Sequence, residues 1–152
     1  MAQVSVRDPY HFWRSLFTYA WVGEASAVVI PEGVTSFAGF VRHAEEVATS
    51  WGNHGEWEYS LSVNLLLACG RPCQYDYLLH TETLTHDWLH LLRQLEMPLV
   101  ALPHHNPTNT TSRNPPPPTI FTTEVLAIIN RLEASVFDEF GYERRTDEFE
   151  LS

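Results

Sequence analysis

The sequence predicts an α/β fold in which helices outnumber strands. Two short stretches of β-type residues, at 3–6 and 74–79, are each followed by a segment with apolar residues at helical spacing. Two more segments with that spacing, at 35–52 and 123–140, have no clear strand before them. Strands that alternate with helices are typical of a parallel sheet with helices packed on it. The 152 residues are enough for one domain with a real core.

The N-terminal stretch VRDPYHFWRSLFTYAW, at residues 6–21, contains a strand end, a tight turn and a helix. Residues 3–6 alternate and include β-branched side chains, so they are predicted to form the strand. Asp8 is placed to cap the helix, and Pro9 to occupy its first position, where the missing N–H costs nothing. At helical spacing the core face consists of Trp13, Leu16, Phe17, Ala20 and Trp21. The opposite side consists of Asp8, His11, Ser15 and Tyr19.

The second helix is predicted to begin after Thr35 or Ser36, either of which can cap it, and to end at Gly52. Its core face is Phe37, Phe40, Val41, Ala44 and Ala48. The segment Gln74–Leu79, QYDYLL, is a strand candidate.

A third helix follows, with Thr85 as its cap and Pro98 as its stop. Its core face is Trp88, Leu91, Leu92 and Leu95. The last helix is predicted as one element from about Thr123 to Phe140, ended by Gly141. Its inward residues are Val125, Ile128, Ile129, Leu132 and Val136.

Two connecting stretches are less regular. Residues 53–73 are ambiguous, and we expect a loop and then a short apolar element. Cys69 and Cys73 in this stretch are expected to have a structural role, as a local bridge or as free thiols. Residues 102–119 form a long polar, proline-rich connection, a kind of loop that is usually functional or disordered. That connection contains an N-glycosylation triplet at Asn109 and a loop arginine, Arg113.

The charge distribution restricts the possible partners. The formal net charge is −10, which argues against nucleic acid as the main partner. Residues 1–22 carry a net charge of +1 and residues 138–152 one of −4, so an anionic ligand fits the N-terminal part better. There is no lysine, which excludes a P-loop lysine within this sequence. No run of 18 apolar residues and no signal-peptide pattern is present, so a soluble chain is expected.

Arg7 and Ser15 are the candidate ligand-binding residues. Arg7 stands where the strand meets the helix, and Ser15 lies two turns along the helix on the face that carries its start. A planar guanidinium binds phosphate with two hydrogen bonds, a hydroxyl can add a third, and free N–H groups at a helix N-terminus add to the attraction. The alternative is that Arg7 is a surface residue and Ser15 a neutral helix position.

Two other patterns suggest chemistry less strongly. His86 and His90, in HDWLH, have the spacing of a zinc-protease motif, but Asp87 replaces the glutamate and no third ligand is identifiable. No metal site is therefore predicted. Glu82 could be a catalytic acid, but its place between a strand and a capped helix favours a role in anchoring backbone at that corner.

Three motifs in order resemble the Golgi-type carbohydrate sulfotransferases that use 3'-phosphoadenosine-5'-phosphosulfate. The strand, Arg-Asp-Pro and helical serine of residues 3–15 are similar to the family's 3'-phosphate-binding element. The segment CGRPCQYDYLLHTETLTHD is similar to a later family segment, through Cys73, Tyr75, Asp76, Glu82, Thr83, Leu84 and Asp87. The segment FDEFGY, Phe137–Tyr142, is similar to the family's closing motif.

This resemblance implies a partial sulfotransferase fold, of the P-loop NTPase type, at residues 1–142, followed by an acidic C-terminal tail at 143–152. It implies the transfer of a sulfonate group from 3'-phosphoadenosine-5'-phosphosulfate to a carbohydrate hydroxyl. Arg7 and Ser15 would hold the 3'-phosphate of this nucleotide donor. It also implies a Golgi-lumen location, with which the triplet at Asn109 agrees.

The family has an N-terminal strand and loop that hold the phosphosulfate, and a general base before the 3'-phosphate element. The sequence begins at that element, so we expect both parts to be missing and assign no catalytic residue. The isolated chain is expected to be inactive. The alternative function is therefore a non-catalytic truncated remnant, or a module that binds a nucleotide or a glycan.

Overall fold

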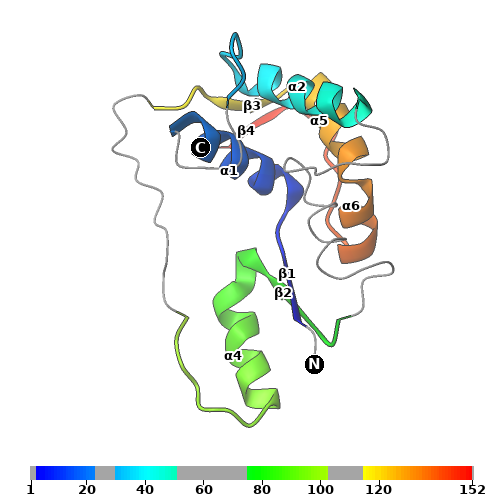
Figure 1. Ribbon diagram of the computed structural model, residues 1–152. Coiled ribbons are helices and arrows are strands. Elements are labelled where there is room, and N and C mark those ends of the chain that lie inside the picture. Colours follow the sequence, from blue (N-terminus) through cyan, green and yellow to red (C-terminus); the bar gives the residue numbers. More distant parts are fainter. Residues whose placement is uncertain (1–2, 23–29, 51–74, 103–114, 152) are drawn as a thin grey trace.

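The N-terminal strand β1 (Gln3–Val6) pairs in parallel with β2 (Tyr77–His80), a strand from the middle of the chain. The computed structural model describes residues 3–22, 30–50, 75–102 and 115–151 (Figure 1). These residues form a mixed α/β structure that is rich in helix and has few strands, as the sequence predicts. A second, antiparallel pair joins β3 (Thr119–Phe121) to β4 (Phe149–Leu151).

The first helix, α1 (Pro9–Val22), confirms the predicted turn between strand and helix. Asp8 caps it, because its Oδ1 accepts hydrogen bonds from the backbone N–H groups of Tyr10 and His11, at 2.9 and 3.1 Å. Three residues of the predicted core face, Trp13, Phe17 and Ala20, are buried. Leu16 and Trp21, from the same face, are partly buried against them.

Helix α2 (Phe37–Ser50) packs on α1 and forms the main core together with α5 (Thr123–Leu132). Ser36 caps α2, since the N–H of Gly39 donates to the Ser36 hydroxyl at 3.2 Å. Large aromatic side chains from α1, α2 and β3 meet in this core in edge-to-face and tilted arrangements, which favour aromatic packing. The buried aromatic residues of this core are Tyr10, Trp13, Phe17, Phe37, Phe40, Phe121 and Phe137.

The parallel pair has a helix on each face. Val6 and Leu78 contact Val136 and Phe140 of α6 (Ala134–Phe140) in a second, smaller core. Successive side chains of a strand point to opposite faces, so Leu79, which is also buried, points away from α6. Helix α4 (Leu84–Gln94) packs on β2 and presents Leu91 and Leu92 as its buried residues. Figure 1 shows α4 and α6 on opposite sides of the pair.

The prediction of one helix from 123 to 140 is wrong. The chain forms two helices, α5 and α6, that meet at Glu133, where φ is −104° and ψ is 19°. The side chain of Glu133 is fully buried and accepts a hydrogen bond from the indole N–H of Trp13 at 3.0 Å. The break allows α5 to fill the main core while Val136 and Phe140 of α6 fill the smaller one.

The start of α4 also differs from the prediction. A 3-10 turn, η1 (Thr81–Thr83), leads directly from β2 into α4, so Thr83 and not Thr85 is the N-cap residue. The strand itself begins at Tyr77, later than predicted, because its four residues match the four residues of β1. The Thr83 hydroxyl donates to the carboxylate of Asp87 at 2.9 Å, an interaction that folds the corner tightly.

The acidic C-terminal segment contains a strand that the sequence did not predict. Most of its residues are exposed, but Phe149 stacks on Phe121 with ring centroids 4.5 Å apart and an interplanar angle of 5°. Leu151 also packs against the main core. These apolar contacts and the pairing of β4 with β3 hold residues 149–151 against the body of the protein.

Several predictions fall on residues outside the described ones. They concern the end of the second helix at Gly52, the cysteines Cys69 and Cys73, the triplet at Asn109 and the loop residue Arg113.

The end of α4 is a Schellman motif with an unusual residue. The N–H of Met97 donates to the carbonyl of Leu92 at 2.9 Å, and that of Glu96 to the carbonyl of Arg93 at 3.1 Å. Glu96 has a φ of +54°, and glycine is the residue that usually stands at this position. The helix therefore ends before Pro98, at a residue whose Cβ disfavours the conformation.

Glu96→Gly should raise the free energy of unfolding by up to about 1 kcal/mol, because glycine adopts positive φ without a Cβ clash. Chemical denaturation measures the change. Gln94→Gly, within the last helical turn, is the control and should lower the free energy of unfolding by about 0.5–1 kcal/mol. Loss of stability in Glu96→Gly would contradict the assignment of this helix end.

Candidate functional site

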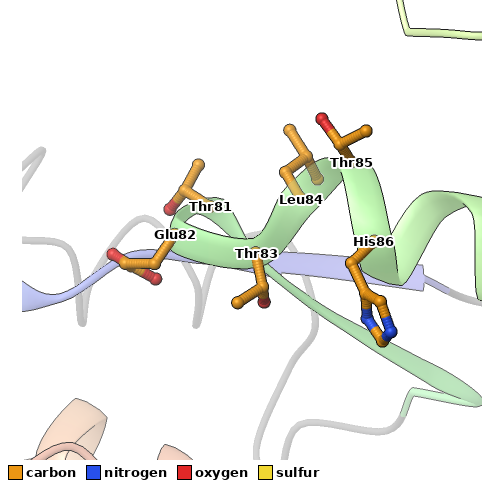
Figure 2. A pocket seen from close by; sticks show the side chains of 6 residues that line it. All are labelled: Thr81, Glu82, Thr83, Leu84, Thr85 and His86. Carbon is orange, nitrogen blue, oxygen red and sulfur yellow. The ribbon is translucent and has the colours of Figure 1, made fainter.

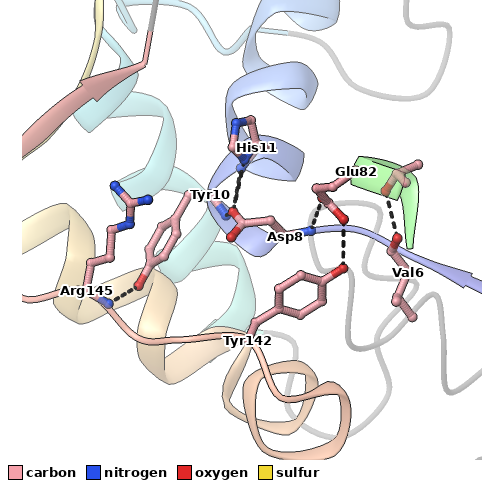
Figure 3. Close-up of polar contacts among 8 residues, drawn as sticks. Val6, Asp8, Tyr10, His11, Glu82, Tyr142 and Arg145 are labelled. Atoms are coloured by element: carbon pink, nitrogen blue, oxygen red, sulfur yellow. Dashed lines mark hydrogen bonds and ion pairs between the residues drawn. The ribbon is translucent and has the colours of Figure 1, made fainter. Parts of the chain in front are cut away.

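The carboxylate of Glu82 connects three distant parts of the chain (Figure 3). Its Oε1 accepts a hydrogen bond from the backbone N–H of Asp8 at 2.7 Å, and its Oε2 accepts one from the hydroxyl of Tyr142 at 3.1 Å. We call these three residues the Glu82 junction. Each residue comes from a different sequence motif. The sequence favoured a role for Glu82 in anchoring backbone at its own corner, whereas the backbone group that it binds is the N–H of Asp8, at the start of α1.

Arg7 lies directly beside the Glu82 junction, between the end of β1 and the start of α1. On its N-terminal side, the carbonyl of Val6 accepts a hydrogen bond from the Thr81 hydroxyl at 2.7 Å. On its C-terminal side, the N–H of Asp8 is bound by Glu82. The position of Arg7 is therefore defined by contacts from η1, the turn that follows β2.

The two predicted binding residues are accessible. Arg7 and Ser15 are both partly exposed, and Ser15 lies outside the two apolar cores. Within the described residues, neither side chain has an ion pair or a hydrogen bond to another side chain. The guanidinium and the hydroxyl can thus donate to a ligand, but no hydrogen bond among the described residues joins these two side chains to each other.

The start of α1 offers less to an anion than the sequence suggested. The N–H groups of Tyr10 and His11 are bound by the Asp8 carboxylate, and the N–H of Phe12 donates to the carbonyl of Asp8 at 2.9 Å. The N–H of Asp8 is bound by Glu82, and Pro9 has none. The expectation that free N–H groups at the start of α1 help to bind an anion is therefore wrong. An anion at this place would have to be bound by side chains.

Asp87 holds the corner between β2 and α4. Its Oδ2 accepts hydrogen bonds from the backbone N–H of His80 and from the hydroxyl of Thr83, both at 2.9 Å. The imidazole Nδ1 of His86 lies 3.3 Å from Oδ1. The bond from the His80 N–H is the main cause that lowers the pKa of Asp87, with smaller contributions from Thr83 and His86.

Tyr142 is a hydrogen-bond donor to this corner. Burial is the main cause that raises the pKa of Tyr142, and the negative charge of Glu82 raises the same pKa further. The phenol is therefore protonated at neutral pH and donates to Glu82. Its ring also packs edge-on against the imidazole of His80, with centroids 5.9 Å apart.

A cavity of about 410 Å³ lies at the start of α4 (Figure 2). Its lining consists of Thr81, Glu82, Thr83, Leu84, Thr85 and His86. Most of its polar groups are already engaged: the hydroxyls of Thr81 and Thr83 donate to Val6 and Asp87, and both oxygens of Glu82 accept hydrogen bonds. The cavity adjoins the Glu82 junction, since both share Glu82.

A second polar network fixes the C-terminal segment. The hydroxyl of Tyr10 donates to Oδ1 of Asn130 and accepts from the backbone N–H of Arg145, both at 2.7 Å. The amide of Asn130 donates to the carbonyl of Arg145 at 3.0 Å. Burial is the main cause that raises the pKa of Tyr10. Sequence reasoning missed Thr81, Tyr10 and Glu133; only Glu133 had a signal, as an acid on the inward stripe between Ile129 and Val136.

The histidines of HDWLH have local partners. His86 contacts Asp87, and Nε2 of His90 lies 3.0 Å from the amide nitrogen of Gln94. In the part of the chain that the structure describes, no three His, Cys, Asp or Glu side chains are grouped so as to hold a metal ion. Among the same residues, none of the helices is both long and apolar enough to cross a membrane.

Comparison with known proteins gave no relative. No protein-family model matches the sequence, and neither the curated proteins nor the solved structures gave a match. The function is therefore argued from the residues and their geometry.

Asp87→Asn should lower the free energy of unfolding by about 1 kcal/mol at pH 7, because the amide accepts the two short hydrogen bonds less well than the carboxylate does. The folded-state pKa of Asp87 lies below its ordinary value of 3.8, so its stabilising contribution is present above about pH 4 and lost as the pH falls through the folded-state pKa. Denaturation at several pH values measures this difference.

The gap between the unmutated protein and Asp87→Asn should thus narrow as the pH falls below about 4. Asp147→Asn, which removes an exposed aspartate near the C-terminus, is the control for loss of charge. A gap that is unchanged or wider below about pH 4 would show that Asp87 does not stabilise the corner as a carboxylate.

Proposed function

We propose that the chain is sulfotransferase-like and binds 3'-phosphoadenosine-5'-phosphosulfate, with Arg7 and Ser15 holding the 3'-phosphate. The proposed activity is transfer of the sulfonate group to a carbohydrate hydroxyl. The observation that carries this proposal is the Glu82 junction. Its residues belong to the three motifs that resemble carbohydrate sulfotransferases, and they meet in space beside Arg7.

This convergence supports the proposal because the motifs were identified separately. Glu82 is 74 residues from Asp8 and 60 from Tyr142, so chance matches would have no reason to meet. The last motif contributes twice: Phe140 packs at a centroid distance of 6.0 Å on Tyr75 of the middle motif, and Tyr142 binds Glu82. The shared geometry favours a common structural unit.

The chemistry at Arg7 suits a phosphate. Its guanidinium has no described side-chain partner, and the N-terminal part of the sequence is the less acidic one. Asp8 is a nearby negative charge, but its Oδ1 is occupied by two backbone N–H groups and by His11. A bidentate hydrogen bond from Arg7, with the hydroxyl of Ser15 as a further donor, is the simplest way to hold a phosphate here.

In sulfonate transfer the acceptor oxygen bonds to sulfur while the bond from sulfur to the 5'-phosphate oxygen breaks. A base takes the hydroxyl proton, and cations stabilise the leaving phosphate. Glu82 is a poor candidate for that base, because both of its oxygens already accept hydrogen bonds. The role proposed for the described residues is binding of the nucleotide.

Adenosine 3',5'-bisphosphate should bind roughly ten- to a hundredfold more tightly than adenosine 5'-monophosphate, since only the former has the phosphate that Arg7 and Ser15 would hold. Arg7→Ala should remove most of this preference, and Ser15→Ala a smaller part. Arg7→Lys should restore it only in part, because a point charge lacks the bidentate geometry. Titration calorimetry measures all of these affinities.

Arg93→Ala is the matched control, because it removes an exposed arginine from the last turn of α4. It should leave the preference for the bisphosphate unchanged. Equal affinity of the unmutated protein for the two nucleotides would count against the 3'-phosphate site. A chain that binds the bisphosphate but transfers no sulfonate would instead be a nucleotide-binding module.

A further inference from the structure

The two peptide groups on either side of Arg7 are both held by residues of η1. The carbonyl of Val6, in the peptide group before Arg7, accepts the Thr81 hydroxyl at 2.7 Å. The N–H of Asp8, in the peptide group after Arg7, donates to Glu82 at 2.7 Å. Peptide groups are planar, so the two soft dihedral angles of Arg7 lie between two fixed planes. The backbone conformation of Arg7 is thus set by two side chains from about 75 residues away.

Glu82 is itself fixed by a third residue. The Tyr142 hydroxyl donates to its second oxygen, and the Tyr142 ring packs beside Val6, Val136 and Phe140 in the smaller core. The carboxylate is therefore attached to a packed part of the protein although Glu82 is exposed. Thr81 and Glu82 are neighbours on a one-turn helix, so a single rigid element holds both sides of Arg7.

We propose that Thr81 and Glu82 are positioning residues, which preset the backbone of Arg7 so that its guanidinium meets an anionic ligand without further ordering. The identity of that ligand, the 3'-phosphate of a nucleotide, rests on the proposed function. Fixing one residue's backbone on binding costs enough free energy to weaken affinity roughly five- to thirtyfold. Presetting Arg7 in the free protein avoids this loss.

Because Glu82 is charged, the direction in which its removal changes the affinity for an anion tests the positioning role. Glu82 is a negative charge close to a site for a negative ligand, so by Coulomb's law alone its removal would strengthen anion binding. If Glu82 positions Arg7, its removal instead weakens binding. The two roles of the same side chain predict opposite changes in affinity.

The experiment compares Glu82→Ala with the unmutated protein, using adenosine 3',5'-bisphosphate in calorimetry. We expect affinity to fall about five- to thirtyfold. Glu82→Gln keeps one acceptor oxygen for the Asp8 N–H and should restore part of the loss. Thr81→Val, which keeps the shape but loses the hydroxyl, should weaken binding in the same direction. If Glu82→Ala does not fold, Thr81→Val tests the positioning role in its place.

Glu148→Ala is the matched control. Glu148 is an exposed carboxylate that also accepts one backbone N–H and one hydroxyl, both from Thr123 at 3.0 Å. Its partner Thr123 is the first residue of α5, so Glu148 holds the start of a different helix. Its loss removes the same charge and the same kinds of hydrogen bond as the loss of Glu82. Melting temperatures of both variants show how far stability falls in each. Only Glu82→Ala should lower nucleotide affinity.

Hydrogen exchange of the Asp8 amide gives a second readout that needs no ligand. Glu82→Ala should speed this exchange about tenfold, because the lost hydrogen bond no longer opposes local opening, and Glu148→Ala should leave it unchanged. Unchanged exchange in Glu82→Ala would overturn the positioning role, whatever the protein binds. Faster exchange with equal or tighter nucleotide binding would overturn it as well. If the unmutated protein shows no preference for the bisphosphate, the proposed function fails, while the exchange rates still decide whether Glu82 fixes this backbone.

Discussion

The hydrogen bonds of the Glu82 carboxylate are the constraint on which the arrangement around Arg7 depends. One side chain satisfies a backbone N–H at the start of α1 and a phenol just after α6, and it does so from the turn between β2 and α4. Without it, these three segments would be joined near Arg7 mainly by the Thr81 hydroxyl, the pairing of β1 with β2 and the small core at Val6. Short polar contacts therefore fix the backbone around Arg7, which the apolar core alone would hold less firmly.

The same principle operates on the other side of α1. The buried Glu133 binds the indole of Trp13, and Tyr10 binds Asn130 and the backbone of Arg145. Because buried polar groups are costly unless they are hydrogen-bonded, these contacts select one orientation of α1 against α5 and the C-terminal segment. The first two turns of α1 are thus fixed by polar contacts to the last third of the chain, while the aromatic face of the helix fills the main core. This helix is capped by Asp8 and carries Ser15.

Residue types and helical spacing predicted the features of the fold that depend on neighbouring residues in the sequence. The strand at 3–6, the cap at Asp8, the burial of Trp13, Phe17 and Ala20 and the helix end at Gly141 all follow from residue types and helical spacing. The break at Glu133 and the β3–β4 pair depend on partners far away in the sequence, which periodicity does not contain. The start of α4 depends on a local hydrogen bond from Thr83 to Asp87, which the spacing of apolar residues does not reveal either. At the site, the corner position of Glu82 favoured a structural role, but its partners were not predictable, since they lie 74 and 60 residues away. The same holds for Thr81, whose hydroxyl acts on a carbonyl 75 residues away.

A double-mutant cycle between Glu82 and Tyr142 tests the central claim most directly. Glu82→Ala, Tyr142→Phe and the double variant are compared with the unmutated protein in chemical denaturation. If the hydroxyl of Tyr142 and the carboxylate of Glu82 are bonded as described, the two losses should not add, and the coupling energy should be at least about 0.5 kcal/mol. If the two changes add to within about 0.3 kcal/mol, the residues act independently and the Glu82 junction does not hold these segments together.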